Sequence, residues 1–329
     1  MDQIENRVVV LGAAGFIGYH IAESISKITS QKTLIVDNFI RGKRDKEFQS
    51  LIANPDIEFI ECDLSLDVSY QDLFHSNDIV INCAALNGTK NFYTNSTGVI
   101  RHSAISSILA AEYAAKANVS KYIFFGTPES YAGAINLGIA NIPTAENVPL
   151  VIDDPLNLRW SYAASKTIGE IATVANYFQF GLNAKIFRIH NIFGPRMGTD
   201  HVVPDLVSKF LSGNYEVYGV EESRAFMYID DLVYILNKFI SNDFIGDNLI
   251  YNIGSSIETQ IKALAELILK QLNIDKSIIP LPGLRGSVLR RVPDVTLLKK
   301  NLEFQETDLT TGVRKYIEWY IKAGPESNT

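Results

Sequence analysis

The chain has 329 residues, 47% of them hydrophobic, which is enough for two domains or for one domain with a large lobe. Acidic residues outnumber basic ones by 37 to 30, and the only basic run is Arg41-Gly42-Lys43-Arg44, so a nucleic-acid partner is not expected. No apolar run approaches the roughly 20 residues that cross a bilayer, and the N-terminus has no pattern of a targeting peptide. A cytoplasmic protein without a membrane partner is expected.

Metal and disulfide chemistry have little support in the sequence. The two cysteines, Cys62 and Cys83, lie in strand-like apolar segments and are expected to be reduced thiols of the core. The five histidines show no metal-ligand spacing, so no metal is expected.

Short β-branched runs alternate with helical patterns, which predicts an α/β fold with a doubly wound parallel sheet. Strands are expected at 7–11, 33–36, 57–60, 78–82, 122–125 and 184–189, and helices at 15–27, 103–117 and 162–180. A loop rich in Pro, Asn and Gly is expected over about 130–158. After Gly194-Pro195 the rhythm changes to short helices and isolated strands such as 216–218, which predicts a smaller C-terminal α/β lobe.

A glycine motif, Gly12-Ala13-Ala14-Gly15-Phe16-Ile17-Gly18, follows the first expected strand and opens the first helix. Gly12 permits a tight turn, Gly15 allows backbone N–H groups to approach a pyrophosphate, and Gly18 allows close packing of helix and strand. The helix N-terminus adds a partial positive charge. This context favours dinucleotide binding over a simple tight turn.

Asp37 ends the second expected strand, where an acidic side chain can hold the adenosine ribose and repel a 2′-phosphate. NAD is therefore favoured over NADP, although Arg41 and Arg44 lie close enough to leave NADP open. Asp63 suits contact with the adenine edge, but an ordinary turn aspartate is an alternative. The other residues expected at the dinucleotide are Phe16, Ile17, Asn38, Leu64, Ala84 and Ala85. The two alanines could equally serve packing.

Tyr162 and Lys166 are four residues apart on an expected helix and so face the same way. A nearby ammonium, together with a positive nicotinamide ring, favours the phenolate and would make Tyr162 a base near neutrality. Lys166 could also hold the nicotinamide ribose. Thr127 follows the fifth expected strand, at the sheet edge where ligands bind, and its hydroxyl could bridge a substrate oxygen and Tyr162. A solvated Tyr/Lys pair and a strand-end cap are the alternatives.

Over roughly residues 7–322 the chain resembles the extended short-chain dehydrogenase/reductases, specifically the nucleotide-sugar epimerase/dehydratase/decarboxylase group. The resemblance rests on the glycine motif, Asp37, Thr127, the Tyr162/Lys166 pair, 188–197, 224–231 and 290–294. It implies that Asn191 contacts the substrate's diphosphate or sugar, and that Arg224 and Arg291 hold the diphosphate and nucleotide end. Guanidinium groups suit phosphate recognition, whereas a surface salt bridge is the alternative for each arginine.

The same resemblance implies an NAD-binding Rossmann domain over 1–190, with a return at about 225–255, and a mainly nucleotide-sugar-binding lobe over 191–329. A homodimer is also implied, formed by two long helices of each subunit. Apolar residues of those helices are Ile105, Ile108, Leu109, Tyr113, Ile168, Ile171 and Val174. Part of these faces must instead pack on the sheet.

Three reactions share a first step in this group, in which the tyrosine removes a hydroxyl proton while NAD takes a hydride from the same sugar carbon, usually C4. The best interpretation of the sequence is a 4-epimerase, because epimerisation needs only the shared residues. A UDP-glucuronate-type decarboxylase and a 4,6-dehydratase are the alternatives. Glu129 favours these two, since both carry Glu at this position, whereas epimerases usually carry a small residue.

Pro128 stands where some dehydratases have an acid, and proline can donate no proton. Two further readings come from other classes of protein. A net dehydrogenase or reductase acting on a non-sugar ketone would need an apolar pocket. The polar residues Asn191, Arg224 and Arg291 argue against such a pocket. A catalytically idle NAD-binding regulator would have no need of Thr127, Tyr162 and Lys166 together.

Overall fold

The computed structural model describes residues 7–28, 32–241, 243–244, 246–283 and 288–324. The first six residues, where no targeting peptide is expected, lie outside these ranges. The chain divides by contact into two compact units. The first comprises the chain up to Gly133, Leu150–Arg188 and Leu236–Tyr251, and the second comprises Ala134–Pro149, Ile189–Ile235 and the chain from Asn252 onward.

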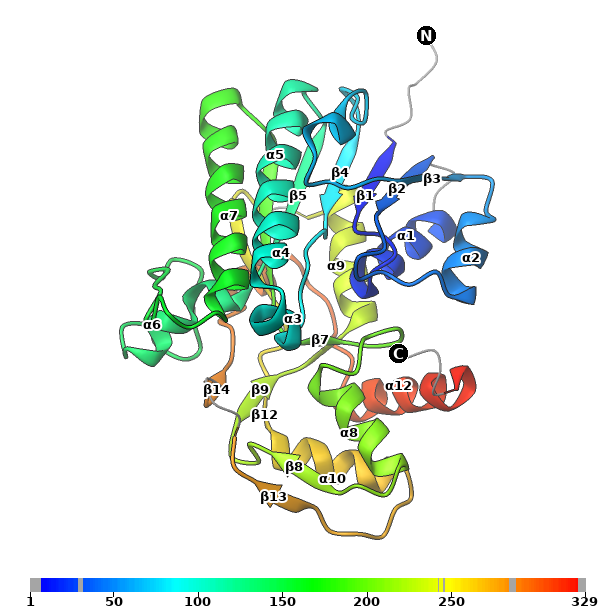
Figure 1. Ribbon diagram of the computed structural model, residues 1–329, viewed down its shortest axis with the longest axis vertical. Helices are drawn as coiled ribbons and strands as arrows, with labels where there is room; N and C mark the ends of the chain where they lie inside the picture. Colours follow the sequence, from blue (N-terminus) through cyan, green and yellow to red (C-terminus); the bar gives the residue numbers. More distant parts are fainter. Residues whose placement is uncertain (1–6, 29–31, 242, 245, 284–287, 325–329) are drawn as a thin grey trace. The chain divides into compact units, whose positions relative to one another are not determined.

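The expected α/β fold is confirmed: a seven-stranded sheet has the order β11-β6-β5-β4-β1-β2-β3 (Figure 1). Strands β1 to β6 pair with their neighbours in parallel. The strands are β1 Val8–Leu11, β2 Thr33–Asp37, β3 Ile57–Glu61, β4 Ile79–Asn82, β5 Lys121–Gly126, β6 Ala184–Ile189 and β11 Ile250–Ile253. Strand order reverses between β1 and β4, and ligands of doubly wound sheets bind at such a switch point.

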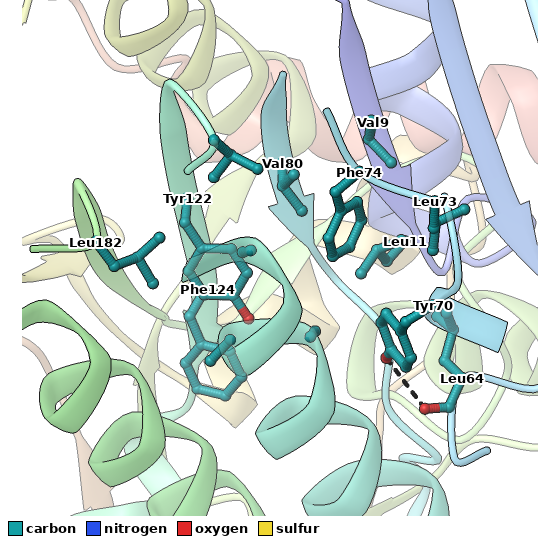
Figure 2. Close-up of a cluster of buried hydrophobic side chains, with 14 of the residues drawn as sticks. Val9, Leu11, Leu64, Tyr70, Leu73, Phe74, Val80, Tyr122, Phe124 and Leu182 are labelled. Atoms are coloured by element: carbon teal, nitrogen blue, oxygen red, sulfur yellow. Dashed lines mark hydrogen bonds between the residues drawn. The ribbon is translucent and has the colours of Figure 1, made fainter. Parts of the chain in front are cut away.

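The central strands are buried on both faces, which explains their continuous apolar runs. One large cluster of buried side chains joins β1, β4 and β5 to the segments around them (Figure 2). Tyr70 is polar at one end only, and its hydroxyl donates hydrogen bonds to the carbonyls of Leu64 and Ser106, both at 3.0 Å. Its ring therefore packs in the core without leaving a buried donor unpaired.

The helices of the first unit are α1 Phe16–Ile28, α2 Lys46–Ile52, α3 Thr89–Thr94, α4 Ser96–Ile100, α5 Ser106–Lys116 and α7 Trp160–Phe180. The expected start of a helix at Ser103 was wrong. Helix α4 begins at Ser96, where the Asn95 side chain accepts the N–H of Gly98, and a π-helical turn at Arg101–Ile105 joins α4 to α5. This cap and the extra residue of a π-turn leave no trace in apolar periodicity.

The expected loop at 130–158 contains helical structure at its start. A 3₁₀ turn covers Pro128–Tyr131, and α6 Ala132–Asn136 follows it. The second unit contains α8 Val202–Leu211, α10 Ile261–Gln271, α11 Thr296–Asn301 and α12 Leu309–Ala323, whereas α9 Ile229–Ile240 spans the boundary between the units. Its short strands include β8 Glu216–Tyr218, which coincides with the expected strand, β9 Ser223–Ala225, β12 Glu258–Gln260 and β14 Arg290–Arg291.

Helices α5 and α7 lie side by side, with α7 against β5 and α5 against β4 (Figure 1). Gly169 of α7 makes this approach close, because a Cβ atom there would overlap the ring of Phe124 and reach 2.9 Å from the Cβ of Ser107. Close contact is what fixes α7, which carries Tyr162 and Lys166, in depth and rotation relative to the sheet.

Gly169→Ala should therefore lower the free energy of unfolding by about 1–3 kcal/mol, although alanine is the better helix former. Urea unfolding measures the change. Ala175→Gly, at an exposed position of the same helix, isolates the intrinsic helix term of about 1 kcal/mol. A Gly169→Ala protein more stable than the wild type would show that the helix is free to shift.

Candidate active site

The glycine turn joins β1 to α1 with a shape that only glycine fits. Gly12 has φ +80°, and a Cβ on it would lie 2.9 Å from backbone atoms of Ala84 at the end of β4. A Cβ on Gly18 would overlap the carbonyl oxygen of Gly12. Gly12 and Gly15 thus leave backbone without side chains just before α1, which begins with Phe16 and Ile17. These features fit a dinucleotide pyrophosphate.

Asp37 is buried at the end of β2 and tied to this turn. Its carboxylate accepts the N–H of Ala14 at 2.9 Å and the N–H of Phe39 at 2.7 Å. The Asn38 side chain accepts the N–H of Ile40 at 3.0 Å and so shapes the following loop. Asp37 is thereby held as an oriented anion, the form that an adenosine ribose requires.

The two arginines of the same loop have different surroundings. Arg44 pairs with Glu61 and lies 3.9 Å over the ring of Phe39, so its guanidinium is occupied on the β3 side. Arg41 is close enough to Tyr162 for its charge to act on that phenol. Arg44 therefore gives little support to a 2′-phosphate and NADP.

Asp63 and Leu64 follow β3 and play different structural parts. Asp63 accepts the N–H of Ser65 at 2.9 Å and lies 3.4 Å from Nδ1 of His102, in the π-turn. Burial alone would raise the pKa of Asp63, but Ser65 and His102 more than offset it and lower the pKa. Leu64 is buried in the core cluster (Figure 2). Packing is thus an established part of its role.

Tyr162 lies in the first turns of α7 and is 9% exposed. It hydrogen-bonds with Thr127 and stacks on Phe92 of α3, with ring centroids 5.2 Å apart. Burial raises the pKa of Tyr162 to about 12, Arg41 and Thr127 act downward, and Glu129 acts upward. Proximity to Lys166 does not produce the low pKa expected from the sequence, because loss of hydration outweighs the neighbouring charges.

Lys166 is 2% exposed, and its ammonium lies 4.2 Å from the centroid of the Phe124 ring. Burial lowers the pKa of Lys166 to about 8. Cys83, after β4, is partly buried, and desolvation raises the pKa of its thiol to about 12. Cys62 and Cys83 are both unpaired thiols. The site therefore contains a lysine poised to lose its charge near neutrality, beside an inert thiol.

Glu129 lies in the 3₁₀ turn after β5, where its N–H donates to Thr127 Oγ1 at 3.3 Å. Its carboxylate is held by Arg159, which immediately precedes α7. The sequence analysis identified Glu129 but missed Arg159 and Phe92. Arg159 stands three residues before Tyr162, a spacing that brings two side chains to one helix face and could have revealed it. No spacing pointed to Phe92, because it belongs to a short helix in an unassigned loop.

In the second unit, β14 pairs with β9 so that Arg291 lies directly beside Arg224. Arg224 also donates to Glu222 at 2.8 Å and to the carbonyl of Ser223 at 2.8 Å. Asn191 has φ +39° and donates to the carbonyl of Ala225, at the end of β9, at 3.3 Å. The three expected substrate residues thus gather around one small sheet. Adjacent guanidinium groups repel each other and are suited to an anion.

Among the residues that the structure describes, no helix is both long and apolar enough to cross a bilayer. Among the same residues, no cluster of three His, Cys, Asp or Glu side chains could hold a metal ion.

Comparison with known proteins gives one family and several relatives. Residues 8–254 match the NAD dependent epimerase/dehydratase family. A UDP-N-acetyl-alpha-D-glucosaminuronate decarboxylase of Bacillus cytotoxicus is 30% identical, over 96% of this chain and 98% of its own length. UDP-glucuronic acid decarboxylase 5 of Arabidopsis thaliana is 25% identical, over 92% of this chain and 85% of its own.

Solved structures agree on the fold. UDP-glucose 4-epimerase from Thermotoga maritima superposes with a TM-score of 0.84 at 25% identity, covering 96% of this chain and 99% of the other. A dTDP-glucose 4,6-dehydratase of Streptomyces venezuelae, solved with NAD bound, has a TM-score of 0.82 at 21% identity, covering 96% of this chain and 97% of the other.

Replacing Lys166 by methionine should stabilise the protein at neutral pH, because the folded state holds a charge that burial disfavours. Between the folded pKa of about 8 and the unfolded pKa near 10.5, the unfolded chain binds more protons, so the wild type gains stability as pH rises through this window. At about pH 7 the variant should be more stable than the wild type by about 1–3 kcal/mol. This figure allows for the lost contact between Lys166 and the Phe124 ring.

Urea unfolding at about pH 7 and pH 10 measures this difference, which should shrink at the higher pH. Lys262→Met, at an exposed position of α10, is the control and should change stability little at either pH. A Lys166→Met protein that is less stable than the wild type at both values would contradict a buried, destabilising charge.

Proposed function

The chain belongs to the NAD dependent epimerase/dehydratase family, and from that membership we propose that it is a decarboxylase of UDP-linked sugar acids. The observation that carries the proposal is Glu129, a carboxylate beside the Tyr162/Thr127 pair. The decarboxylases of Bacillus cytotoxicus and Arabidopsis thaliana support it, because they align with nearly the whole chain. This ranks the decarboxylase above the 4-epimerase that the sequence analysis placed first.

NAD is the proposed cofactor, with Gly12, Gly15 and Gly18 at its pyrophosphate and Asp37 at its adenosine ribose. Other proposed contacts, carried over from the sequence analysis, are Phe16, Ile17, Asn38, Asp63, Leu64, Ala84, Ala85, Tyr162 and Lys166. When bound, NAD takes a hydride from the sugar C4 and returns it to the same carbon.

Tyr162 is the proposed base for the C4 hydroxyl, and Thr127 orients the shared hydrogen bond. Lys166 is the proposed contact to the nicotinamide ribose, and the positive ring of a bound nicotinamide would favour the Tyr162 phenolate. Once C4 is a ketone, the C6 carboxylate lies β to a carbonyl. The bond between C5 and C6 then breaks, carbon dioxide leaves, and its electron pair forms the C4–C5 enolate.

Glu129 is the proposed donor of the proton that C5 receives when the enolate returns to the ketone. As the C4 ketone is reduced again, Tyr162 gives back to the C4 oxygen the proton that it took. Summed over these steps, a carboxylate and one proton become carbon dioxide and a C5–H bond. The reaction therefore consumes one proton, which must reach Glu129 from solvent.

The second unit supplies the proposed nucleotide and phosphate contacts. The neighbouring Arg224 and Arg291 suit the two charges of a diphosphate, and Asn191 is the proposed contact to the diphosphate or sugar. These roles rest on the resemblance and on the chemistry of guanidinium groups. The same three polar residues argue against an apolar ketone as substrate. An idle regulator is less favoured because Tyr162, Thr127 and Lys166 are assembled together.

A 4-epimerase is the second candidate, favoured by the likeness to the Thermotoga maritima enzyme. It would need Tyr162 and Thr127 but no role for Glu129. A 4,6-dehydratase is less favoured, because Pro128 is buried at the start of the 3₁₀ turn and has no proton for a leaving hydroxyl.

We also propose a homodimer and a cytoplasmic location. Ile105 of the π-turn and Ile168 and Ile171 of α7 are exposed, although apolar. Ala-rich faces of the same helices pack inside the unit, so the outward residues are left for a second copy. The unpaired thiols of Cys62 and Cys83 support a reducing compartment.

The decarboxylase proposal predicts that the purified protein converts UDP-glucuronate or UDP-N-acetylglucosaminuronate to a product lighter by one carbon dioxide. Mass spectrometry of the nucleotide-sugar pool measures it, with UDP-glucose and UDP-N-acetylglucosamine as neutral counterparts. Glu129→Gln and Tyr162→Phe should each reduce the rate by at least about 10²-fold, the size of a lost general acid or base. An isomer of unchanged mass, formed equally well by Glu129→Gln, would establish the 4-epimerase instead.

Ile171→Glu should shift the proposed dimer toward monomers, because a charge placed in an apolar interface is costly to desolvate. Sedimentation measures the mass of each protein. Glu112→Lys, which changes charge on α5 without removing an apolar residue, is the comparison. A wild-type monomer would refute the dimer without touching the reaction.

A further inference from the structure

The Glu129–Arg159 ion pair uses the whole carboxylate of Glu129. Arg159 Nη2 lies 2.9 Å from Oε1 and 2.8 Å from Oε2, and Nε lies 3.1 Å from Oε2. Such a planar fork on a carboxylate is among the strongest polar contacts that a protein makes. The two side chains are only 15% and 23% exposed, so solvent weakens the contact little.

The pair lies against the proton-transfer residues. Arg159 precedes Tyr162 by three residues at the start of α7, and the Glu129 N–H is bonded to Thr127, which bonds to Tyr162. The charge of Glu129 also reaches the Tyr162 hydroxyl and raises its pKa. The ion pair is thus part of the same small site, and not a remote brace of the fold.

A carboxylate held in this way cannot serve as a proton donor. It is ionised, and three hydrogen bonds from the guanidinium stabilise the ionised form. The proposed reaction needs a proton on Glu129, so Arg159 must release it during the cycle. A group that displaces one carboxylate from a guanidinium fork has to match it in charge and shape, and another carboxylate does so.

We propose that Arg159 binds the carboxylate of the sugar acid by exchange with Glu129. The exchange selects substrates that carry a carboxylate, and it frees Glu129 to become a proton donor. This rests on the proposed function and names its specificity-determining residue. Once released, Glu129 is a buried carboxyl group without its cation, beside a second carboxylate, and it takes up a proton from solvent. A neutral sugar has a C6 hydroxyl that cannot displace Glu129.

The charges around the pair fit the exchange. Tyr93 of α3 and Asp153 both act electrostatically on Arg159, and Asp153 accepts the Trp160 indole N–H at 3.0 Å. The charged and titratable groups around Glu129 include Arg159 and Tyr162, and Arg41 acts on the same phenol. Asp153 keeps the surroundings of Arg159 from becoming strongly positive. The substrate carboxylate is therefore recognised without the excess stabilisation that would slow its loss.

The test compares the affinities of UDP-glucuronate and UDP-glucose by isothermal titration calorimetry. It uses the NAD-saturated Tyr162→Phe protein, so that binding is observed without turnover. UDP-glucuronate should bind more tightly than UDP-glucose, and Arg159→Met should reduce this preference about 30-fold or more. Arg159→Lys, which keeps the charge but not the fork, should recover only part of it.

Repeating the titrations in buffers of different ionisation enthalpy counts the protons taken up. Uptake should approach one proton for UDP-glucuronate and none for UDP-glucose, and Glu129→Gln should abolish it. Glu170→Gln is the matched control, since Glu170 forms a similar fork with Arg188 further along α7. The affinity ratio should stay unchanged in this variant.

An unchanged affinity ratio in folded Arg159→Met and Arg159→Lys proteins, with no proton uptake in the parent, would overturn the exchange and leave the ion pair a structural contact. The proposed function is judged separately by release of carbon dioxide from the protein that retains Tyr162. If carbon dioxide is released while the preference for UDP-glucuronate over UDP-glucose does not depend on Arg159, only the exchange proposal fails. If no carbon dioxide is released while the Arg159-dependent preference remains, only the decarboxylase assignment fails.

Discussion

The contact of α7 with β5 is the constraint on which the rest of the site depends. Gly169 brings the helix so close to the Phe124 ring that Lys166, nearly one turn before it, is buried over the same ring. Burial then sets the electrostatics, lowering the pKa of Lys166 and raising that of Tyr162. A helix packed at ordinary distance would leave both side chains more hydrated, with pKa values nearer those of free lysine and tyrosine.

The same helix collects partners from segments far apart in sequence. Thr127 and Glu129 come from the end of β5, and Phe92 comes from α3 after β4. Parallel strands place their carboxyl ends at one edge, so the residues that follow them meet the start of α7. The glycine turn after β1 and Asp37 at the end of β2 belong to this edge as well. One topological fact therefore brings together the cofactor residues and the proton-transfer residues of the first unit.

Glu129 was predicted as a site residue from the sequence, but its ion pair with Arg159 was not. Its position alone favoured a dehydratase or decarboxylase, and this agrees with relatives that are decarboxylases. The guanidinium of Arg159 limits what Glu129 can do, because a carboxylate held by two or more hydrogen bonds is neither a free base nor a proton donor. Arg224 shows the same lesson in the second unit, where Glu222 already contacts the arginine expected to bind phosphate.

The α/β fold, the family and the bounds of strands β1 to β6 to within a residue could all be predicted from the sequence. These follow from apolar periodicity and from glycines that a tight turn requires, both of which are local properties of the chain. The sequence also identified Tyr162, Lys166, Thr127 and Glu129 as candidates. Four features emerged only from the three-dimensional fold. Helix α4 begins at Ser96, Phe92 stacks on Tyr162, Arg159 holds Glu129, and burial raises the Tyr162 pKa where a lower one was expected. Each of these depends on desolvation or on contacts between distant segments, which no periodicity within one segment records.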